Sequence, residues 1–585
     1  MKTKHFLCLA SLVGCLSLLQ NSAQGQSESP QERLNAITND YWLREQKIGH
    51  AYSFAEPIFP DYLYKGTRED YDKDAAYFAR VLANLKKIKL NKLPVSSQTD
   101  YDLMYWLATM RLEATRFYDN TFPPVTPYHA NSLSEDFIFS HLALSNAEDL
   151  QRYLGLLHQQ AMRLGAYLDK LKYLSNQGIR LPKAETEVAM GFMRSFHRAP
   201  SSLPYFVAEE RLVKIETAAR IDFQRQVSQI LEQEIIPAFD KIADYLGGDY
   251  LSQAPEAVGL GQYPEGKAYY RHLVKWHTTT SLSPEAIFAL GMQNVTRIRK
   301  SLDSLRILTG FRGELKDFYL FLQKDPRFLA TTPDEVGIRL KGHLVRMEKV
   351  IPQLISTRTR TPYDVRRLPL ELEPAMTFGY YHTPSGSDSV GLYLYNGSKL
   401  DQRSQVSAAS LAFHEIMPGH HLQICLQKDN PTLPAFRRNL QVNAFLEGWG
   451  DYASHLGTEL GLYQDPYDYC GRLLMEMFIS VRLVVDVGMN DQGWSREQAM
   501  AFMRDNVIES TEQIKTETLR YSCDIPAQAL SYKMGSMRLI ELRNKYQNLL
   551  GSKFDVLRFH DAVLRLGCLP LAILEKSLDR EFGVK

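Results

Sequence analysis

The sequence concentrates an acid and three histidines in one short segment, His414-Glu415-Ile-Met-Pro418-Gly419-His420-His421. A His-Glu pair on a buried helix is typical of hydrolases in which two histidines bind a zinc ion and the glutamate polarises a water molecule. That arrangement has its second histidine four residues after the first, one helical turn along the same face. Here Pro418 occupies that position and cannot bind a metal. The segment therefore predicts a metal site only if the helix is interrupted.

The same segment predicts such an interruption. Along a straight helix six residues rise about 9 Å, which is too far for His414 and His420 to share one zinc ion with bonds of about 2 Å. Pro418 removes an internal hydrogen bond and Gly419 permits unusual backbone angles, so we expect a kink or a bulge there. This would bring His420 to the position of the standard second ligand. His421 would then point to the other side or take the ligand role itself, and the sequence leaves both open.

A third ligand is expected, because catalytic zinc takes three protein ligands and a water molecule. Glu447 begins a new helical pattern in an apolar and aromatic setting, after a loop at 430–438. Asp451 follows one turn later on the same face, where it would either orient a ligand histidine or lie at the surface as a solvated acid. The predicted ligands are therefore His414, His420 and Glu447, and an ordinary structural role is the alternative for each.

Long helical patterns surround this segment. Apolar residues recur at three- and four-residue spacing in five stretches, 74–85, 101–118, 147–175, 206–245 and 333–356. Ser283 before Pro284 predicts a helix start, with the serine as N-cap and the proline in the first turn. No flexible linker and no fixed-period repeat divides residues 26–585. We therefore expect one large, mostly α-helical unit with a central cleft, either undivided or arranged as two lobes around that cleft.

One stretch just before the histidines departs from the helical pattern. Residues 376–396 are rich in Tyr, Thr, Gly and Ser, and Leu392-Tyr-Leu-Tyr395 predicts a strand after a turn at 385–388. A small β-hairpin or sheet is therefore expected beside the metal helix. Its edge would offer hydrogen bonds to an extended peptide, and an ordinary surface hairpin is the alternative.

The composition is ordinary for a globular protein with a sizeable core. Of 585 residues, 44% are hydrophobic and 23% are charged. The 68 Lys and Arg residues balance 67 Asp and Glu residues, so the net charge gives no attraction to nucleic acid, and none is expected as a partner. Of the six cysteines, the four that follow the N-terminal region occur singly, which argues against a zinc-cysteine site or a disulfide framework and favours small buried hydrophobes. They are Cys425, Cys470, Cys523 and Cys568.

The N-terminus is typical of an exported protein. A short basic start is followed by a largely apolar stretch from Phe6 to Leu19 and by small residues up to Gly25, which is the layout of a signal peptide at residues 1–25. The apolar stretch is too short for a comfortable membrane span, and no transmembrane segment is expected later. Leu12-Val-Gly-Cys15 also resembles a lipobox. A lipid anchor at Cys15 is thus the alternative to a soluble periplasmic or secreted protein.

Six blocks of the sequence together resemble the bacterial DUF885 family, which is placed among the gluzincin-type zinc peptidases. The block that resembles the HExxPGHH motif of that family is His414-Glu-Ile-Met-Pro-Gly-His-His-Leu-Gln423. The others are His277-Thr-Thr-Thr-Ser-Leu-Ser-Pro-Glu285, Glu447-Gly-Trp-Gly-Asp-Tyr452, Arg482-Leu-Val-Val-Asp486-Val-Gly488, Arg520-Tyr521 through Gln528-Ala-Leu-Ser-Tyr-Lys533, and Phe559-His-Asp561 through Gly567-Cys-Leu-Pro570-Leu571. The blocks keep their order along the chain.

The resemblance implies a mostly helical metallopeptidase-like fold with a general base, Glu415, and three zinc ligands, His414, His420 and Glu447. Two positions depart from the family pattern. Ala527 stands where relatives usually carry Gly, and Asn490 stands where His is expected. Neither replaces a proposed ligand, but a change at a position that touches substrate would alter preference or rate.

Three residues of the later blocks have predicted roles around the reaction. Tyr532 is the candidate hydrogen-bond donor to a developing oxyanion, with Tyr521 behind it, because a phenol donates without carrying a full charge. Plain packing is the alternative for both tyrosines. Arg520 would grip a carboxylate of the substrate or form a structural salt bridge.

The sequence therefore predicts an exported zinc-dependent metallohydrolase, most simply a peptidase that acts on a peptide or a small amide. A metal-dependent amidase or esterase with a non-peptide substrate would use the same ligands. An exported binding protein that kept the fold is the alternative from another class, although it would have no need of Glu415 as a base. Histidine and carboxylate ligands would also accept cobalt or manganese.

Overall fold

The computed structural model describes residues 28–50, 59–127, 129, 138–140, 142–370, 373, 378–384 and 390–584. The predicted signal peptide, Cys15 and the predicted turn at 385–388 lie outside these residues. The described chain is mostly α-helical with one small sheet of three strands, as the sequence predicts. None of the helices in the described part of the chain is both long and apolar enough to cross a membrane.

The first half of the chain contains the helices α1 (Pro30–Lys47), α2 (Arg68–Leu85), α3 (Val95–Ala114), α6 (Ala147–Asn176), α7 (Lys183–Arg194), α8 (Thr217–Ile230), α9 (Ile236–Tyr245), α10 (Gly266–Thr278) and α11 (Pro284–Leu308). The second half contains α12 (Leu315–Lys324), α13 (Pro333–Val350), α14 (Ala408–Glu415), α15 (His420–Lys428), α16 (Ala435–Arg438), α17 (Asn443–Glu459), α18 (Pro466–Asn490), α19 (Arg496–Arg504), α20 (Thr511–Leu519), α21 (Ser531–Leu550), α22 (Val556–Leu566) and α23 (Leu571–Phe582).

Most of the predicted helices are present at the expected places. The pattern at 147–175 corresponds to α6, and Ser283 caps α11 by accepting a hydrogen bond of 3.3 Å from the backbone N–H of Ala286. The prediction for 206–245 was wrong at its start, because α8 begins only at Thr217. There the side chain of Glu216 accepts the backbone N–H of Ala219 and fixes the first turn.

The sheet consists of β1 (Tyr363–Arg367), β2 (Gly379–His382) and β3 (Gly391–Tyr395), in the order β1-β3-β2. The predicted strand at 392–395 is confirmed as β3, and it pairs with β2 in antiparallel fashion. The sequence did not reveal β1, whose charged residues give no strand pattern and which pairs in parallel with β3. Because β2 lies at an edge of the sheet, half of its backbone groups point away from β3.

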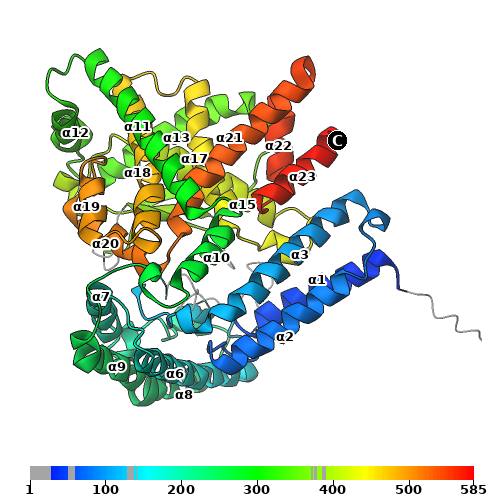
Figure 1. The fold of residues 1–585 in the computed structure, drawn as a ribbon. Coiled ribbons are helices and arrows are strands. Elements are labelled where there is room, and N and C mark those ends of the chain that lie inside the picture. The colour runs from blue at the N-terminus through cyan, green and yellow to red at the C-terminus, as the bar shows by residue number, and fades with distance from the viewer. Residues whose placement is uncertain are drawn as a thin grey trace, which may run out of the picture.

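Three clusters of buried apolar side chains hold the helices together. The first joins α1–α3 to α13, α14, α17 and α21–α23, the second joins α6–α10, and the third joins α11, α12 and α18–α20. Helix α18 contributes to two of them, with Leu483 in the second and Val485 in the third. Figure 1 shows α6–α9 gathered at the bottom of the molecule and α11, α13, α17 and α21 at the top, with α10 between them.

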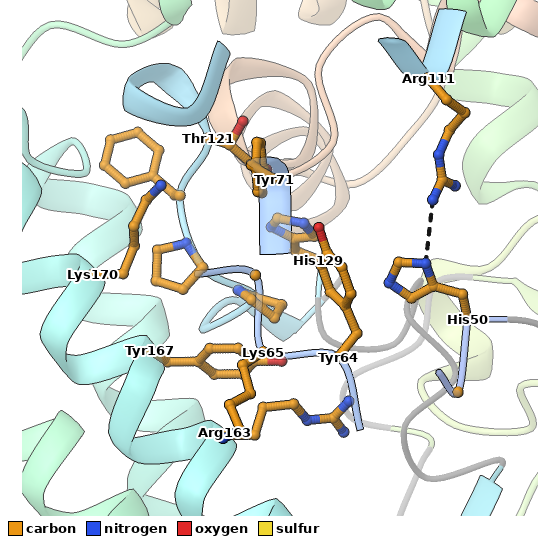
Figure 2. Close-up of a pocket in the computed structure, with 15 residues that line it drawn as sticks. His50, Tyr64, Lys65, Tyr71, Arg111, Thr121, His129, Arg163, Tyr167 and Lys170 are labelled. Carbon is orange, nitrogen blue, oxygen red and sulfur yellow. Dashed lines mark hydrogen bonds between the residues drawn. The ribbon is translucent and has the colours of Figure 1, made fainter. Parts of the chain in front are cut away.

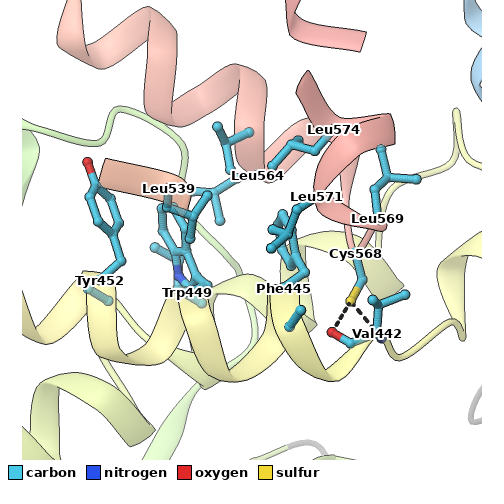
Figure 3. Packing of buried hydrophobic residues seen from close by; sticks show 14 of the residues in the cluster. Val442, Phe445, Trp449, Tyr452, Leu539, Leu564, Cys568, Leu569, Leu571 and Leu574 are labelled. Carbon is cyan, nitrogen blue, oxygen red and sulfur yellow. Dashed lines mark hydrogen bonds between the residues drawn. The ribbon is translucent and has the colours of Figure 1, made fainter. Parts of the chain in front are cut away.

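Helix α17, which carries Glu447, is fixed by packing against the C-terminal helices. Its residues Phe445 and Trp449 lie against Leu539 of α21 and Leu571 of α23 (Figure 3), and all four are buried. All four cysteines of the described chain are free and buried, as predicted. One of them, Cys568, accepts the backbone N–H of Val442 at the start of α17 over 3.0 Å. Because α17 is packed against α21 and α23 through these buried side chains, it is a rigid support for a binding site.

Candidate metal centre

The predicted break in the histidine helix is present. Helix α14 ends at Glu415 and α15 begins at His420, so the four residues between them leave the helical path. A side chain at Gly419 would place its Cβ 1.8 Å from the carbonyl oxygen of His414, so only glycine fits this bend. From α17, the indole N–H of Trp449 donates to the carbonyl of Pro418 over 2.9 Å and fixes the loop.

The break brings His414, His420 and Glu447 together. The Nε2 atoms of His414 and His420 lie 3.5 Å and 3.3 Å from the same carboxylate oxygen, Oε2 of Glu447. The two imidazole rings are nearly perpendicular, with centroids 4.6 Å apart. One ligand atom from each residue lies within 4.8 Å of the other two, and no other such group of His, Cys, Asp or Glu occurs in the described chain. Two ligands that bind one zinc ion at tetrahedral angles lie about 3.3–3.4 Å apart, which matches these distances.

His421 faces away from this cluster. Its Nε2 lies 3.0 Å from the carbonyl oxygen of Thr361, and its Nδ1 lies 2.8 Å from the hydroxyl of Tyr381. Because a carbonyl only accepts, Nε2 carries the hydrogen and Nδ1 accepts from Tyr381. Burial lowers the pKa of His421 to about 4, which keeps the ring neutral. Of the two adjacent histidines, the one that joins His414 is therefore His420.

The charges at the cluster are strongly coupled. Burial alone would raise the pKa of Glu447, but hydrogen bonds from His414 and His420 hold it well below its usual range. Burial opposes protonation of His420, and Glu447 nevertheless raises its pKa. Burial raises the pKa of Glu415, and the nearby histidines and a hydrogen bond from the backbone of Tyr381 act in the opposite direction. The cluster thus combines an anionic carboxylate with two imidazoles, a donor set suited to a divalent cation.

The cluster opens into a cavity of about 360 Å³ that Glu415 also lines. Gly450 on α17 is packed against the ring of His414, so close that a Cβ there would lie 2.7 Å from it. Asp451 also lines the cavity, but it is buried and lies 3.4 Å from Arg472. The alternative of a solvated surface acid at Asp451 is therefore wrong. Its ion pair is with an arginine, and no bond from it to a histidine is present in the described structure.

Of the three residues with predicted roles around the reaction, two line the cavity and Tyr521 lies behind its wall. The ring of Tyr532 lines the cavity and stacks on His414, with centroids 6.1 Å apart and planes at 16°. Arg520 also lines the cavity and donates to Gln528 over 2.7 Å. Tyr521 is fully buried, its hydroxyl donates to Glu517, and it is not among the described residues that line the cavity, so it supports the wall from behind.

The comparisons place this chain in a family and a fold. The sequence matches the family described as "Bacterial protein of unknown function (DUF885)" over residues 55–578. This chain belongs to the DUF885 family. No curated protein matches it.

Two solved structures share the fold of this DUF885 protein. A "putative lipoprotein" from Colwellia psychrerythraea is 24% identical, with a TM-score of 0.85 over 95% of this chain and 100% of that one. A "putative lipoprotein of unknown function" from Shewanella oneidensis is 18% identical, with a TM-score of 0.70 over 94% of this chain and 99% of that one. At these identities the likeness is one of fold.

Two charged residues of the cavity wall in this DUF885 protein had no predicted role. Arg482 on α18 and Glu517 on α20 both line the cavity and are joined by a hydrogen bond of 3.2 Å. The sequence does carry a signal for Arg482, which is the only charged residue in the mostly apolar stretch from Phe478 to Val485. A lone charge on a buried helix usually has a specific partner. Finding that partner requires the fold.

The two departures from the family pattern meet at one buried acid, Asp486. The backbone N–H of Ala527 donates to it over 3.0 Å, and the amide of Asn490 donates over 3.2 Å. Ala527 has a φ of 66°, in the region that favours glycine. Asn490 is buried and is not among the described residues that line the cavity beside His414. Ala527 and Asn490 therefore both belong to the buried surroundings of Asp486.

A second cavity, of about 310 Å³, is lined by residues of the N-terminal helices and α6 (Figure 2). Its described wall is basic and aromatic, with Arg163, Tyr167 and Lys170 at helical spacing along α6. On another side, Arg111 lies 3.2 Å from Nδ1 of His50. No described residue of this wall is an acid, so the cavity lacks the histidine and carboxylate combination found at α14 and α17.

Proposed function

We propose that this DUF885 protein is an exported zinc-dependent hydrolase, most simply a peptidase. The observation that carries the proposal is the convergence of His414, His420 and Glu447, with Glu415 in the same cavity. Two histidines, one glutamate and an open position are a donor set of catalytic zinc sites, whereas structural sites are usually closed by four protein ligands. A general base such as Glu415 beside the cluster is needed only for a reaction that transfers a proton.

The residues present fit a zinc ion. The distances of 3.3 Å and 3.5 Å between ligand atoms agree with a shared ion, and Glu447 is held as an anion. When bound, zinc supplies a Lewis acid that lowers the pKa of a water molecule and polarises a carbonyl group. His414, His420 and Glu447 would hold it.

The chain's own side chains supply the remaining steps. The carboxylate of Glu415 accepts a proton from the attacking water and returns it to the nitrogen of the leaving amine. The water oxygen forms the new C–O bond as the C–N bond breaks. Tyr532 donates a hydrogen bond to the developing oxyanion. Burial and then the charge of Glu447 raise the pKa of Tyr532, so the phenol keeps its proton near neutral pH.

The edge of β2 favours a peptide as the substrate. Asn396 donates its backbone N–H to the carbonyl of Phe378 over 2.8 Å, which shows that Phe378 faces β3. Because backbone groups alternate in an antiparallel pair, those of Gly379 and Tyr381 face away from β3. Both residues line the catalytic cavity. The backbone N–H of Tyr381 already hydrogen-bonds Glu415, but the other outward-facing groups of this edge can pair with an extended peptide, which a small non-peptide ester or amide cannot do.

Export rests on the N-terminal sequence and on the relatives. Residues 1–25 have the layout of a signal peptide, and two proteins of the same fold are described as "putative lipoprotein". The mature N-terminus is either free after cleavage near Gly25 or anchored through a lipid on Cys15. Mass spectrometry of the mature N-terminus distinguishes the two forms.

The test is zinc content together with turnover. Purified wild type and the matched control Glu459→Ala, on the same helix as Glu447, should hold about one zinc per chain. His414→Ala and Glu447→Ala should hold none. Glu415→Gln should keep its zinc and lose turnover of a peptide library by about 10²- to 10⁴-fold. A wild type that takes up no zinc would overturn the proposal, and a zinc-loaded protein without hydrolysis of any peptide, amide or ester would favour a binding protein.

A further inference from the structure

Two arginines in the wall of the catalytic cavity share a single glutamate. Arg482 on α18 donates to Oε2 of Glu517 over 3.2 Å, and Arg520, in the short helix η12 (Arg520–Asp524), lies 3.7 Å from the other oxygen. The side chains of Arg482, Arg520 and Glu517 are 7%, 14% and 2% exposed. Two guanidinium groups thus face one carboxylate. A buried wall with such an excess of positive charge is completed by an anion.

The surrounding charges leave this excess in place. Glu509 is a further acid that interacts electrostatically with Arg482, and Arg403 is a further cation that interacts electrostatically with Glu509. Burial raises the pKa of Glu509 to about 7, so it is only partly ionised near neutral pH. Glu415 and Glu447 belong to the metal centre. Asp451, another acid of the wall, is paired with Arg472, and Asp486, whose charge interacts with Arg520, has its pKa raised by burial to about 7. The cavity is therefore polarised, with Glu415 and Glu447 at the metal centre and, beyond the shared Glu517, an excess of cations at Arg482 and Arg520.

Arg482 is held rigidly in this wall. Its Nε donates to the hydroxyl of Tyr521 over 2.6 Å, and its Cζ lies 4.3 Å from the ring centre of Phe478. Within the described structure, its hydrogen bonds use Nε and Nη2, whereas a guanidinium carries five N–H donors. Donors remain for a ligand in the cavity. A fixed guanidinium loses little entropy when it binds a carboxylate.

The ring of Tyr532 lies near both Arg482 and the metal centre, and its two contacts give a measure of the distance between them. Its ring centre lies 6.1 Å from that of His414 and 4.7 Å from Cζ of Arg482. One peptide residue spans about 3.3–3.6 Å, so one or two residues would bridge the two sites. In a bound peptide, the segment after the scissile bond ends in the α-carboxylate. Paired arginines bind that group through charge-assisted hydrogen bonds.

We propose that Arg482 and Arg520 bind the free C-terminal carboxylate of a peptide and thereby make this protein an exopeptidase that releases one or two residues from the C-terminus. This inference rests on the proposed hydrolase function and adds the end of the chain that is cut. The hydrolysis itself is unchanged: water supplies the new C–O bond, the C–N bond breaks, and the proton passes through Glu415 to the leaving amine.

The test uses the zinc-loaded full chain and one library of N-acetylated hexapeptides, prepared with free C-terminal carboxylates and again as C-terminal amides. Mass spectrometry reports the bond that is cut, and kcat/KM is compared for the two forms. Wild type should prefer the free acids by about 100-fold, the usual scale for a buried charge pair. Arg520→Gln should reduce the ratio of the two kcat/KM values, acid over amide, to about one. Arg520→Lys should restore part of the preference, and Arg504→Gln, an exposed control, should keep all of it.

The outcomes separate this inference from the proposed function. Cleavage of acids and amides at equal rates, or cuts spread along the peptides, would overturn the inference and leave the hydrolase in place. If neither form is cut, calorimetry with the same two libraries decides. Tighter binding of the acids, lost in Arg520→Gln, would keep the carboxylate site and reject the hydrolase, whereas equal binding or none would reject both. Because the comparison of acids with amides needs only wild type, a variant that fails to fold does not block the test.

Discussion

The hydroxyl of Tyr381 donates a hydrogen bond of 2.8 Å to Nδ1 of His421 and ties the second histidine of the pair to the edge strand β2. The other ring nitrogen of His421 lies 3.0 Å from the carbonyl of Thr361. The backbone of Tyr381 in turn hydrogen-bonds Glu415. One of the adjacent histidines thus lies beside His414 and Glu447, and the other holds the strand whose backbone contacts Glu415, the proposed base.

Replacing His421 should reduce turnover without loss of metal. His421→Ala removes the acceptor of the Tyr381 hydroxyl and loosens β2 beside Glu415. We expect zinc content to stay at the wild-type value and kcat/KM to fall about 10-fold or more, as is usual when a supporting hydrogen bond is removed. Zinc analysis and peptide turnover of the same preparation measure both quantities.

Two variants control for this interpretation. Tyr381→Phe removes the same bond from the other side and should reproduce the loss of turnover. His420→Ala should lose the zinc. If His421→Ala lost the zinc and His420→Ala kept it, the ligand assignment would be reversed.

Gly450→Ala should weaken zinc binding while the fold survives. A Cβ at this position would lie 2.7–2.9 Å from three atoms of the His414 ring, so the ring must move by several tenths of an ångström. Metal sites tolerate shifts of only about 0.2 Å in their ligand distances. We expect zinc affinity to fall about 10- to 100-fold, which a competition titration with a chelator measures.

Gly155→Ala is the matched control for this variant. Gly155 lies in the middle of α6, and a Cβ there would meet no atom within 4 Å. Alanine should stabilise the helix by about 0.5–1 kcal/mol and leave zinc affinity unchanged. Equal zinc affinity in Gly450→Ala and wild type would show that His414 does not bind the metal in this orientation.

The sequence predicts the parts of the site that follow from local geometry. His414, Pro418, Gly419 and His420 lie within one short segment, so the helical rise and the helix-breaking residues together are enough to bring the two histidines side by side. Glu447 could be predicted because a carboxylate at the start of an apolar helix is uncommon. The metal-binding roles themselves stay predictions.

The parts that depend on distant segments could not be predicted. The pair of Arg482 with Glu517 requires α18 to pack beside α20, and the pairing of β1 with β3 joins strands that have no local signal for each other. The same holds for Asp451, whose surroundings include Arg472 on another helix. The late start of α8 had a local cause in the cap at Glu216, but the apolar spacing before it masked that signal.

Tyr532→Phe should lower kcat and leave zinc content unchanged. The ring of Tyr532 stacks on His414, and its hydroxyl is the donor that we place at the oxyanion. Removal of one such donor costs about 10²- to 10³-fold in kcat, while the ring of phenylalanine preserves the stacking. Steady-state kinetics on the peptide library checks this. A variant with wild-type kcat would reduce Tyr532 to a packing role.

The stability of the region around Asp486 should depend on pH. Burial raises the pKa of Asp486 to about 7, although the hydroxyl of Tyr270 and the backbone of Ala527 donate to it and act in the opposite direction. In the unfolded chain the pKa is about 4. Between these values the unfolded chain ionises first, so the stability that wild type owes to this group falls as the pH rises, by up to about 1.4 kcal/mol per pH unit. Above about pH 7 both states are ionised, and no further loss occurs.

Asp486→Asn isolates this effect. The amide cannot ionise, and with its oxygen in the place of Oδ1 it keeps the bonds from Tyr270 and Asn490, but its NH₂ group then faces the backbone N–H of Ala527, which costs about 1–3 kcal/mol. The variant should therefore melt at a lower temperature than wild type at pH 5, and the difference should become smaller at pH 8, where wild type has lost the contribution of its protonated carboxyl. Calorimetric melting of both proteins at the two pH values measures the difference. A difference that grows from pH 5 to pH 8 would mean that the carboxylate is stabilised by its four hydrogen bonds and that its pKa lies below the usual value.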